Sequence, residues 1–417
     1  MQLGSDTFRA VLNDVEIALG CECSVVGLWE DGEGEPSYEI VHGDKCVQFF
    51  RRLSFSDLEK RFLDHVVDVF NSAFNDDFHS GMDMAYCSAM ASVSVMDMAV
   101  AKFVGNMHWY EVFRIIQNIK SLSYEKYEGS AVKTGLLVFD GRTDFGIRRP
   151  GVNFIEFSEL DSKGIILNDL VLRDAAFYRY VDGYDSFYAC DVSGVVKGYY
   201  NIEESVMSSF DKICGQKVLS VLNVDGNSMF YIGITSYSDV EIYKSNKSRI
   251  VFRRGKWRIF DCSVIDAVVG NVEFDIEPWR CFYALSKIRK GSLVLFTDRF
   301  GEIEDDRFIK KHIDSGSGVF DVIRESVKKC GVRSVVESGE LLRMLTTDGM
   351  VMFSSDFRQV MDINAIVDTS KAPSNEMGGG GRSTAAASAS MYGIAVKVSE
   401  DGPISVYRNG RCVYKVG

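Results

Sequence analysis

The sequence predicts an α/β protein with three successive regions: a mainly helical region over residues 1–130, a β-rich region over 131–261, and a mixed-sheet domain over 262–417. Three observations support this division. Apolar residues recur at helical spacing in the first region, and β-branched and aromatic runs dominate the second. In the third, helix-like and strand-like segments alternate. A chain of 417 residues is long enough for two or three domains.

Helices in the first region are predicted over residues 56–74, 82–104 and 109–121. Ser56 and Glu59 have the spacing of a capping box, in which each side chain accepts the other's backbone N–H at the start of a helix. The apolar residues that follow recur every three or four positions. They would therefore bury one face of the helix.

The composition changes near Val132, where β-branched and aromatic runs begin and Gly, Asn and Asp separate them. Residues 224–227, Val-Asp-Gly-Asn, are predicted to form a hairpin turn because Asp-Gly suits the positive φ angles of such turns. We therefore expect a sheet with few helices over residues 131–261.

The last region is predicted to form an α/β domain with a mixed sheet. Gly331 follows an amphipathic pattern and is expected to be the C-cap of that helix. Asn409-Gly410 is expected to join the last two strands in a hairpin. In order, the expected elements are a helix over 279–288, a strand over 292–297, helices over 319–330 and 341–345, and strands over 349–353, 394–398, 404–407 and after 410.

Negative charge is concentrated in the first 261 residues, which hold 27 Lys and Arg against 38 Asp and Glu. The remaining residues hold 20 against 21. Duplex DNA and anionic membranes are polyanions, so we expect neither as the main partner of the acidic part. The nearly neutral C-terminal region is compatible with a small anionic ligand.

The cysteines and the hydropathy predict a cytoplasmic protein. The 10 cysteines are scattered without a CxxC pair, and the N-terminus lacks the basic-then-apolar pattern of a signal peptide. Reduced thiols are therefore expected. The most apolar stretch, residues 84–96, is shorter than the ~20 residues that a membrane-spanning helix needs.

The first candidate site is Thr347-Asp348-Gly349, between a predicted helix and a predicted strand. A carboxylate at such a position can bind a divalent metal ion or accept a proton from a ribose hydroxyl. A glycine beside it lets a ligand approach the backbone. Asp-Gly is also a common turn pair, so these residues alone leave both interpretations open.

The second candidate is a run of four glycines at 378–381, followed by Arg382, Ser383 and Thr384. Backbone N–H groups of such a segment can surround an anion, and guanidinium and hydroxyl groups can donate hydrogen bonds to phosphate. A helix beginning in the following alanine run would add a favourable dipole. The same composition suits a flexible linker, but the strand predicted over 394–398 follows directly.

The order of these segments resembles that of the diadenylate cyclase family. That family carries Asp-Gly-Ala, then Gly-Thr-Arg-His-Arg-Ala-Ala, then a strand ending in Val-Ser-Glu, and a closing Ile-Ser-x-x-x-Asn-Gly. The corresponding segments here are 348–350, 380–386, 398–400 and 404–410. The resemblance extends over residues 262–417 and is most specific from Gly380 to Arg411.

The resemblance implies a homo-oligomer in which two such domains face each other, each holding one ATP, and join the two nucleotides into cyclic di-AMP. Asp348 would then bind Mg²⁺ or Mn²⁺ and activate the ribose 3′-hydroxyl. Glu400 matches a glutamate that lies near the site in some members. The nucleotide and its phosphates would be held by Gly349, Gly380, Gly381, Arg382, Ser383, Thr384 and Ser399.

Two of the family's donor residues are absent here. Ser383 and Thr384 stand where the family has His and Arg, and Met350 replaces the Ala of Asp-Gly-Ala. Loss of one transition-state donor typically costs ~10²–10³ in rate. The substitutions are therefore expected to reduce catalysis more than nucleotide binding.

The leading hypothesis is a nucleotide-binding sensor with a degenerate diadenylate-cyclase-type domain, acting in bacterial nucleotide signalling or defence. Its partner would be an adenine or cyclic nucleotide, bound without a metal cofactor, and residues 1–261 would transmit the binding event. An active diadenylate cyclase that uses Mg²⁺ or Mn²⁺ is the alternative. A structural domain without a ligand is the third hypothesis.

Overall fold

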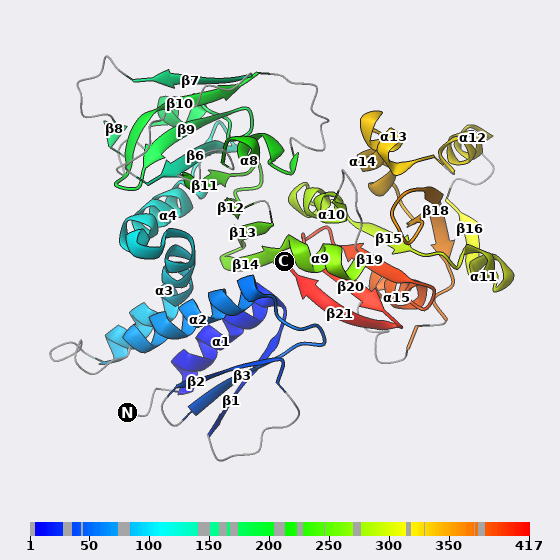
Figure 1. Ribbon diagram of the computed structural model, residues 1–417, viewed down its shortest axis with the longest axis horizontal. Helices are drawn as coiled ribbons and strands as arrows, with labels where there is room; N and C mark the ends of the chain where they lie inside the picture. The colour runs from blue at the N-terminus through cyan, green and yellow to red at the C-terminus, as the bar shows by residue number, and fades with distance from the viewer. Residues whose placement is uncertain are drawn as a thin grey trace. The chain divides into compact units, whose positions relative to one another are not determined.

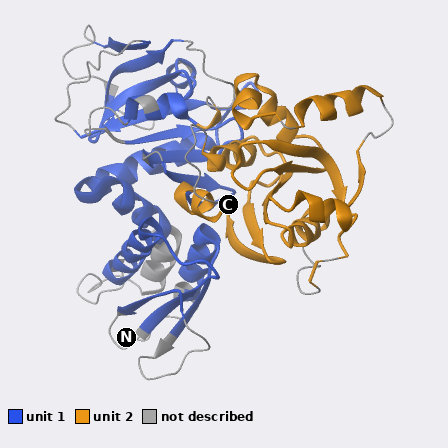
Figure 2. Cartoon of the chain, turned by 45° about the vertical axis from the view of Figure 1, so that its right-hand side comes forward, with its two compact units in different colours: residues 1–206, 215–261 blue, residues 207–214, 262–417 orange. Residues whose placement is uncertain are grey.

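The computed structural model describes two compact units of the chain, shown in Figure 2. Unit 1 comprises residues 1–206 and 215–261, and unit 2 comprises 207–214 and 262–417. The described residues are 5–27, 36–42, 45–73, 84–140, 151–157, 165–166, 174–203, 213–222, 228–245, 247–269, 277–313, 318–328, 330–370, 372–373 and 380–417.

The long helices of unit 1 are α1 (Ser5–Leu19), α2 (Asp57–Ala73), α3 (Met84–Gly105) and α4 (Trp109–Ser123). The last three confirm the predicted helices. The capping box is also confirmed, since the Glu59 N–H donates to Ser56 Oγ and the Ser56 N–H donates to Glu59 Oε2. Within the described part of the chain, no helix combines the length and the apolar character needed to cross a membrane.

Unit 1 contains a small antiparallel sheet in the order β1-β3-β2 and a large sheet in the order β14-β13-β12-β11-β6-β9-β10-β7, with β8 paired to β10 (Figure 1). In the large sheet β6 and β9 are parallel, and the other pairs are antiparallel. The strands are β1 (Glu22–Gly27), β2 (Tyr38–His42), β3 (Lys45–Phe50), β6 (Thr134–Phe139), β7 (Val152–Glu156), β8 (Ile165–Ile166), β9 (Ser186–Asp191), β10 (Val195–Ile202), β11 (Ser228–Ile234), β12 (Val240–Ser245), β13 (Ser248–Arg253) and β14 (Lys256–Asp261).

Unit 1 also contains short helices and strands. The hairpin turn predicted at 224–227 lies outside the described residues, so that prediction is not tested. The short elements are η2 (Asn106–His108), β4 (Lys126–Tyr127), β5 (Ser130–Ala131), α6 (Ala175–Arg179) and α8 (Gln216–Leu222).

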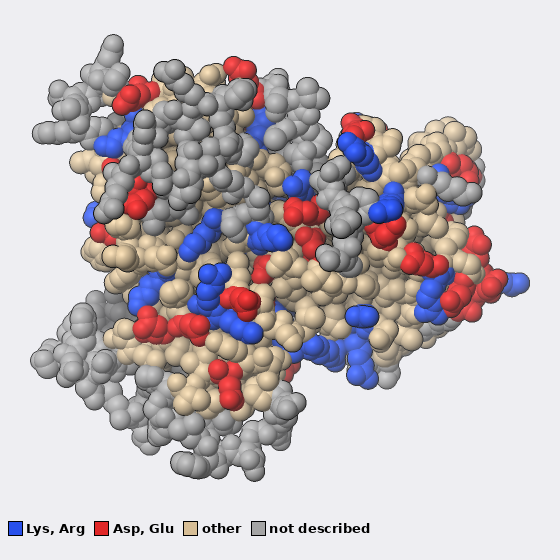
Figure 3. Space-filling model, in the orientation of Figure 1, with Lys and Arg blue, Asp and Glu red and all other residues tan. Residues whose placement is uncertain are grey.

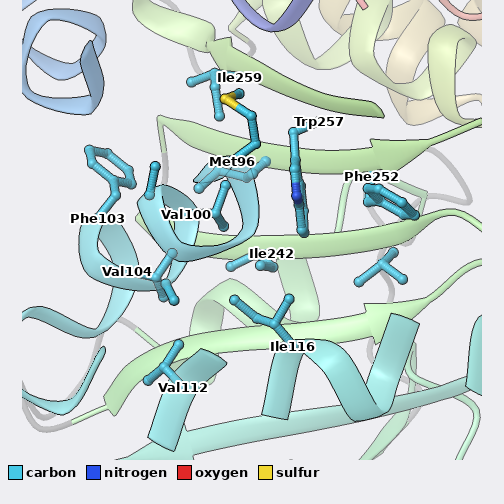
Figure 4. Close-up of a cluster of buried hydrophobic side chains, with 14 of the residues drawn as sticks. Met96, Val100, Phe103, Val104, Val112, Ile116, Ile242, Phe252, Trp257 and Ile259 are labelled. Atoms are coloured by element: carbon cyan, nitrogen blue, oxygen red, sulfur yellow. The ribbon is translucent and has the colours of Figure 1, made fainter. Parts of the chain in front are cut away.

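Helices α3 and α4 pack against the large sheet in the core of unit 1 (Figure 4), to which α1, α2 and the small sheet also contribute. A carboxylate is buried in this core: Asp97 of α3 accepts hydrogen bonds from Lys120 Nζ at 2.7 Å, Gln117 Nε2 at 2.8 Å and Trp257 Nε1 at 2.7 Å. A buried charge is tolerated when it is paired and hydrogen-bonded in this way. Asp97 thus joins α3, α4 and β14.

Unit 2 is built around one mixed sheet in the order β16-β18-β17-β15-β19-β20-β21, with β15 and β17 parallel. The protein is therefore an α/β protein with mixed sheets, as the sequence predicts. Its elements are α9 (Cys262–Val269), α10 (Pro278–Lys287), β15 (Ser292–Phe296), α11 (Phe300–Asp305), β16 (Ile309–His312), α12 (Gly318–Val327), α13 (Val332–Glu337), α14 (Glu340–Leu345), β17 (Met350–Phe353), β18 (Val360–Val367), α15 (Gly381–Ala389), β19 (Ile394–Val398), β20 (Ile404–Arg408) and β21 (Arg411–Val416).

Helices cover both faces of this sheet. On one face the alanines of α15 pack against Leu293, Met350 and Ala395 in a common core. Because successive strand residues point to opposite faces, the intervening residues face α10 and α14, and Phe282 of α10 contacts Phe296 of β15 at a ring distance of 6.1 Å.

Two local predictions in unit 2 had different outcomes. The Asn409-Gly410 hairpin is confirmed, with φ angles of 50° and 77° between β20 and β21. The prediction that Gly331 is a C-cap is wrong, because α12 ends at Val327 and Gly331 is the N-cap of α13, with the extended backbone angles φ −66° and ψ 135°. The Gly331 carbonyl accepts the Val335 N–H at the start of this next helix.

Charged side chains of both signs are interspersed over the described surface of each unit on the face drawn in Figure 3. No disulfide joins the cysteines whose side chains the structure describes.

Candidate functional site

The predicted site residues of unit 2 meet at one edge of its sheet. Strands β15 and β17 are parallel and β19 is antiparallel to β15, so the starts of β15 and β17 lie beside the end of β19. In register, Leu293 pairs with Met350 on one side and with Lys397 on the other. Residues that precede β15 and β17 or follow β19 are therefore brought together, although they are distant in sequence.

Gly349 places Asp348 at this edge. Its φ of +93° lies in the region that side chains disfavour, and a Cβ there would lie 2.6 Å from the Asn364 carbonyl carbon. The preceding turn is fixed by Thr347, whose hydroxyl oxygen lies 2.9 Å from Asn364 Oδ1 and 2.7 Å from the Met344 carbonyl. The Asp348 side chain is left 79% exposed to solvent.

The glycine-rich segment leads into helix α15. Gly380 is its N-cap with φ 85°, and the Gly380 carbonyl accepts the N–H groups of Ser383 and Thr384. Ser383 is buried, whereas Gly381 is exposed. Residues 378 and 379 lie outside the described residues. The segment from Gly380 onward is thus the beginning of a packed helix.

Arg382 connects the separate parts of the site. Its Nη1 lies 2.8 Å from Glu400 Oε1, and its Nη2 lies 3.7 Å from Asp348 Oδ1. The guanidinium passes over Gly291, where a Cβ would lie only 2.1 Å from Nη1. One cation is therefore held between two carboxylates, and Gly291 leaves the space for it.

Ser399 shapes the turn that presents Glu400. The Ser399 N–H donates to the Pro403 carbonyl at 2.9 Å, and the Gly402 N–H donates to the Ser399 carbonyl at 2.8 Å. Ser286 of α10 anchors this turn, because its buried hydroxyl donates to the Gly402 carbonyl at 2.5 Å. Glu400 is left 69% exposed beside Arg382.

A further basic residue belongs to this site and was missed in the sequence. Lys397 Nζ donates to Ser383 Oγ at 2.6 Å. Burial, and next the charge of Lys415, lower the pKa of Lys397. The signal in the sequence is a single lysine within a predicted strand whose adjacent residues, at 396 and 398, are both valine.

The donor set for a metal ion is incomplete as it stands. Among the described residues, no group of three or more His, Cys, Asp or Glu side chains is placed to hold a metal ion. Mg²⁺ is commonly bound by one or two carboxylates together with substrate phosphates. Asp348 and Glu400 fit that role only if Arg382 first gives up its contacts with them.

A pocket of about 510 Å³ lies elsewhere in unit 2, and it contains none of the predicted site residues. Its basic side chains are largely compensated: His312 Nε2 lies 2.8 Å from the buried Asp362, and Lys310 Nζ lies 3.0 Å from Asp368. It is lined by Phe300, Ile303, Glu304, Arg307, Ile309, Lys310, His312, Arg324, Lys328 and Asp362.

Comparison with known proteins gives a distant likeness. No protein-family model matches the sequence, and no curated protein matches it. Among solved structures, a double mutant of DacA from Staphylococcus aureus is similar at 19% sequence identity with a TM-score of 0.23, over 32% of this chain and 79% of the DacA chain.

Proposed function

We propose that unit 2 binds an adenine or cyclic nucleotide at the Arg382 site and that the protein is a nucleotide sensor in bacterial signalling or defence. The observation that carries this proposal is the convergence of Arg382, Asp348, Glu400 and the Lys397–Ser383 pair at the start of α15. Basic side chains and hydroxyl donors beside a helix N-terminus are suited to a phosphate group. Residues 1–261 would then transmit the binding event.

Binding without turnover is favoured by the state of the two carboxylates. Asp348 and Glu400 both lie beside Arg382, so the guanidinium would compete with a metal ion for them. The two positions after Arg382 carry hydroxyl groups in place of the basic residues of the diadenylate cyclase motif. Nucleotidyl transfer depends on positioning and neutralising charge around phosphorus, which this residue set supplies poorly.

An active diadenylate cyclase is the second candidate because the acidic residue of the motif is retained. Asp348 is 79% exposed, so a divalent ion arriving with ATP would have access to it. In that case two copies of unit 2 would face each other. This function would require Mg²⁺ or Mn²⁺, whereas sensing would not.

The test is incubation of the full chain with ATP and Mn²⁺, with products identified by mass spectrometry. In parallel, thermal shifts are measured against ATP, AMP, cyclic AMP and cyclic di-AMP. Two variants, Asp348→Asn and Arg382→Ala, are compared with Arg343→Ala. Arg343 is a suitable control because it is an exposed arginine of unit 2 that also pairs with a carboxylate, Glu340, at 2.9 Å.

The sensor predicts no product and stabilisation by one nucleotide, which Arg382→Ala reduces and Arg343→Ala does not. Cyclic di-AMP formation that Asp348→Asn abolishes would overturn the sensor and establish the cyclase. If no nucleotide shifts the melting temperature and no product forms, unit 2 is a structural domain and both proposals fail.

A further inference from the structure

Lys397 has an environment that an unliganded fold does not explain. Its strand neighbours Val396 and Val398 are fully buried on the opposite face of the sheet. Lys397 itself points to the face that α15 covers, and its Nζ donates to the buried Ser383 hydroxyl at 2.6 Å. Among the described residues, no carboxylate lies within 4.0 Å of this ammonium group. Two neighbouring cations, Lys415 and Arg382, act with burial to lower the pKa of Lys397, and the Cys412 thiol acts in the opposite direction.

This arrangement costs folding free energy. Partial burial disfavours a charged ammonium group, and neighbouring positive charges disfavour it further. A hydroxyl partner supplies a hydrogen bond but no opposite charge. A cation kept half-buried among cations is therefore best explained by an anion that binds beside it, since such perturbed groups concentrate at functional sites.

Arg382 is less available to an anion than Lys397 is. The guanidinium contacts both Glu400 and Asp348, so this set of three side chains has a net negative charge. Lys397 lies under the first turn of α15, where the helix dipole also favours negative charge. The exposed Lys415 adds positive potential from the neighbouring part of the sheet.

We propose that Lys397 and Ser383 form the phosphate-binding element of this site, and that the site selects a phosphodiester nucleotide over a nucleoside triphosphate. This inference rests on the proposed nucleotide-binding function. One uncompensated ammonium group, a hydroxyl and a helix N-terminus match the single negative charge of a phosphodiester. The several charges of a metal-free triphosphate would exceed this capacity and would be repelled by Asp348 and Glu400.

The binding test uses isothermal titration calorimetry of the full chain with cyclic di-AMP, and with ATP in the presence and absence of Mg²⁺. Lys397→Gln should weaken cyclic di-AMP binding by about 10- to 100-fold, the usual effect of losing a charged hydrogen bond. Lys397→Arg should retain binding within a few-fold because it retains the charge. The matched control is Lys311→Gln, an exposed lysine on β16, which is an edge strand of the same sheet.

A double variant, Lys397→Met with Ser383→Ala, separates a ligand-binding role from a structural one. It removes both hydrogen-bonding groups together, so no buried hydroxyl is left unpaired. We expect it to melt at or above the temperature of the wild type without ligand and to bind cyclic di-AMP as weakly as Lys397→Gln does. A lower melting temperature with unchanged binding would show that Lys397 is structural and would overturn the inference.

The remaining outcomes separate this inference from the function on which it rests. If the wild type binds no nucleotide at all, the proposed function itself fails. If nucleotides bind and Arg382→Ala weakens them while Lys397→Gln does not, only the role of Lys397 fails. Metal-free ATP that binds more tightly than cyclic di-AMP would overturn the proposed selectivity.

Discussion

The Arg382 guanidinium lies between two carboxylates from different parts of unit 2, with Nη1 2.8 Å from Glu400 Oε1 and Nη2 3.7 Å from Asp348 Oδ1. Asp348 precedes β17 and Glu400 follows β19, so one side chain links two loops at the same edge of the sheet. The guanidinium therefore already has anionic partners before any ligand binds. A phosphate that approaches it must compete with them.

Weakening this competition should improve ligand binding. Glu400→Gln removes one negative charge and frees Arg382, so we expect cyclic di-AMP affinity to rise by up to about fivefold, in line with the ~0.2–1 kcal/mol of an exposed ion pair. Calorimetric titration measures the effect. Glu340→Gln, which frees Arg343 in the same unit, should change nothing. Weaker binding after Glu400→Gln would instead mean that Glu400 contacts the ligand.

The space above Gly291 should matter for binding more than for stability. A Cβ at this position would lie 2.1 Å from Arg382 Nη1 and 3.1 Å from Glu400 Cγ. Both neighbours are flexible side chains, so Gly291→Ala should keep a nearly wild-type melting temperature while it displaces the guanidinium. We expect the free energy of nucleotide binding to become less favourable by about 1 kcal/mol. Gly301→Ala is the control, since its Cβ would meet nothing within 4 Å.

Gly349→Ala should destabilise unit 2 strongly. The residue would keep a φ of +93° and would place its Cβ 2.6 Å from the backbone of Asn364, which cannot move as a side chain can. Gly339 has a similar φ of +75° but open space around it. Gly339→Ala should therefore cost only the ~1–2 kcal/mol of a left-handed conformation, and Gly349→Ala clearly more. Equal losses in melting temperature for the two variants would contradict this interpretation.

The buried Asp97 should be a major contributor to the stability of unit 1. Asp97→Ala removes the acceptor of Lys120, Gln117 and Trp257 and leaves the Lys120 charge without its partner. Breaking a buried pair in this way typically costs about 3–5 kcal/mol. Denaturant unfolding should show this loss.

The control for Asp97 is the exposed pair in which Asp68 lies 2.6 Å from Lys102. Asp68→Ala should cost less than about 1 kcal/mol because such pairs are well solvated. If the two variants lost the same stability, the buried position of Asp97 would not be what determines its contribution.

Local signals in the sequence predicted local structure well. The Ser56–Glu59 capping box and the Asn409-Gly410 hairpin depend on residues close in sequence, and both are present. Gly331 was assigned wrongly because a helix end and a helix start both favour glycine. Its role was decided by a distant segment, since the Val332 N–H donates to the Arg358 carbonyl at 2.8 Å.

The candidate site was predictable only in part for the same reason. Asp348, Arg382 and Glu400 stand out as motif residues, and the structure brings them together. In the sequence, Lys397 is one polar residue in a predicted strand. Its place in the site depends on its hydrogen bond with Ser383, which forms only after α15 packs on the sheet. Gly291 was also not predictable from the sequence, because the need for a glycine there comes from the Arg382 guanidinium, which passes over it only in the folded unit.

The strand order of unit 2 also has a kinetic consequence. Leu293 must pair with both Met350 and Lys397. Two long stretches of chain therefore have to close into loops before the ends of β15, β17 and β19 lie side by side. Such non-local pairing makes folding slow. A partly synthesised or truncated chain that ends before β19 would contain Asp348 without Lys397 or Glu400. The proposed nucleotide site would therefore form late in folding, and only a completely folded unit 2 would bind the nucleotide.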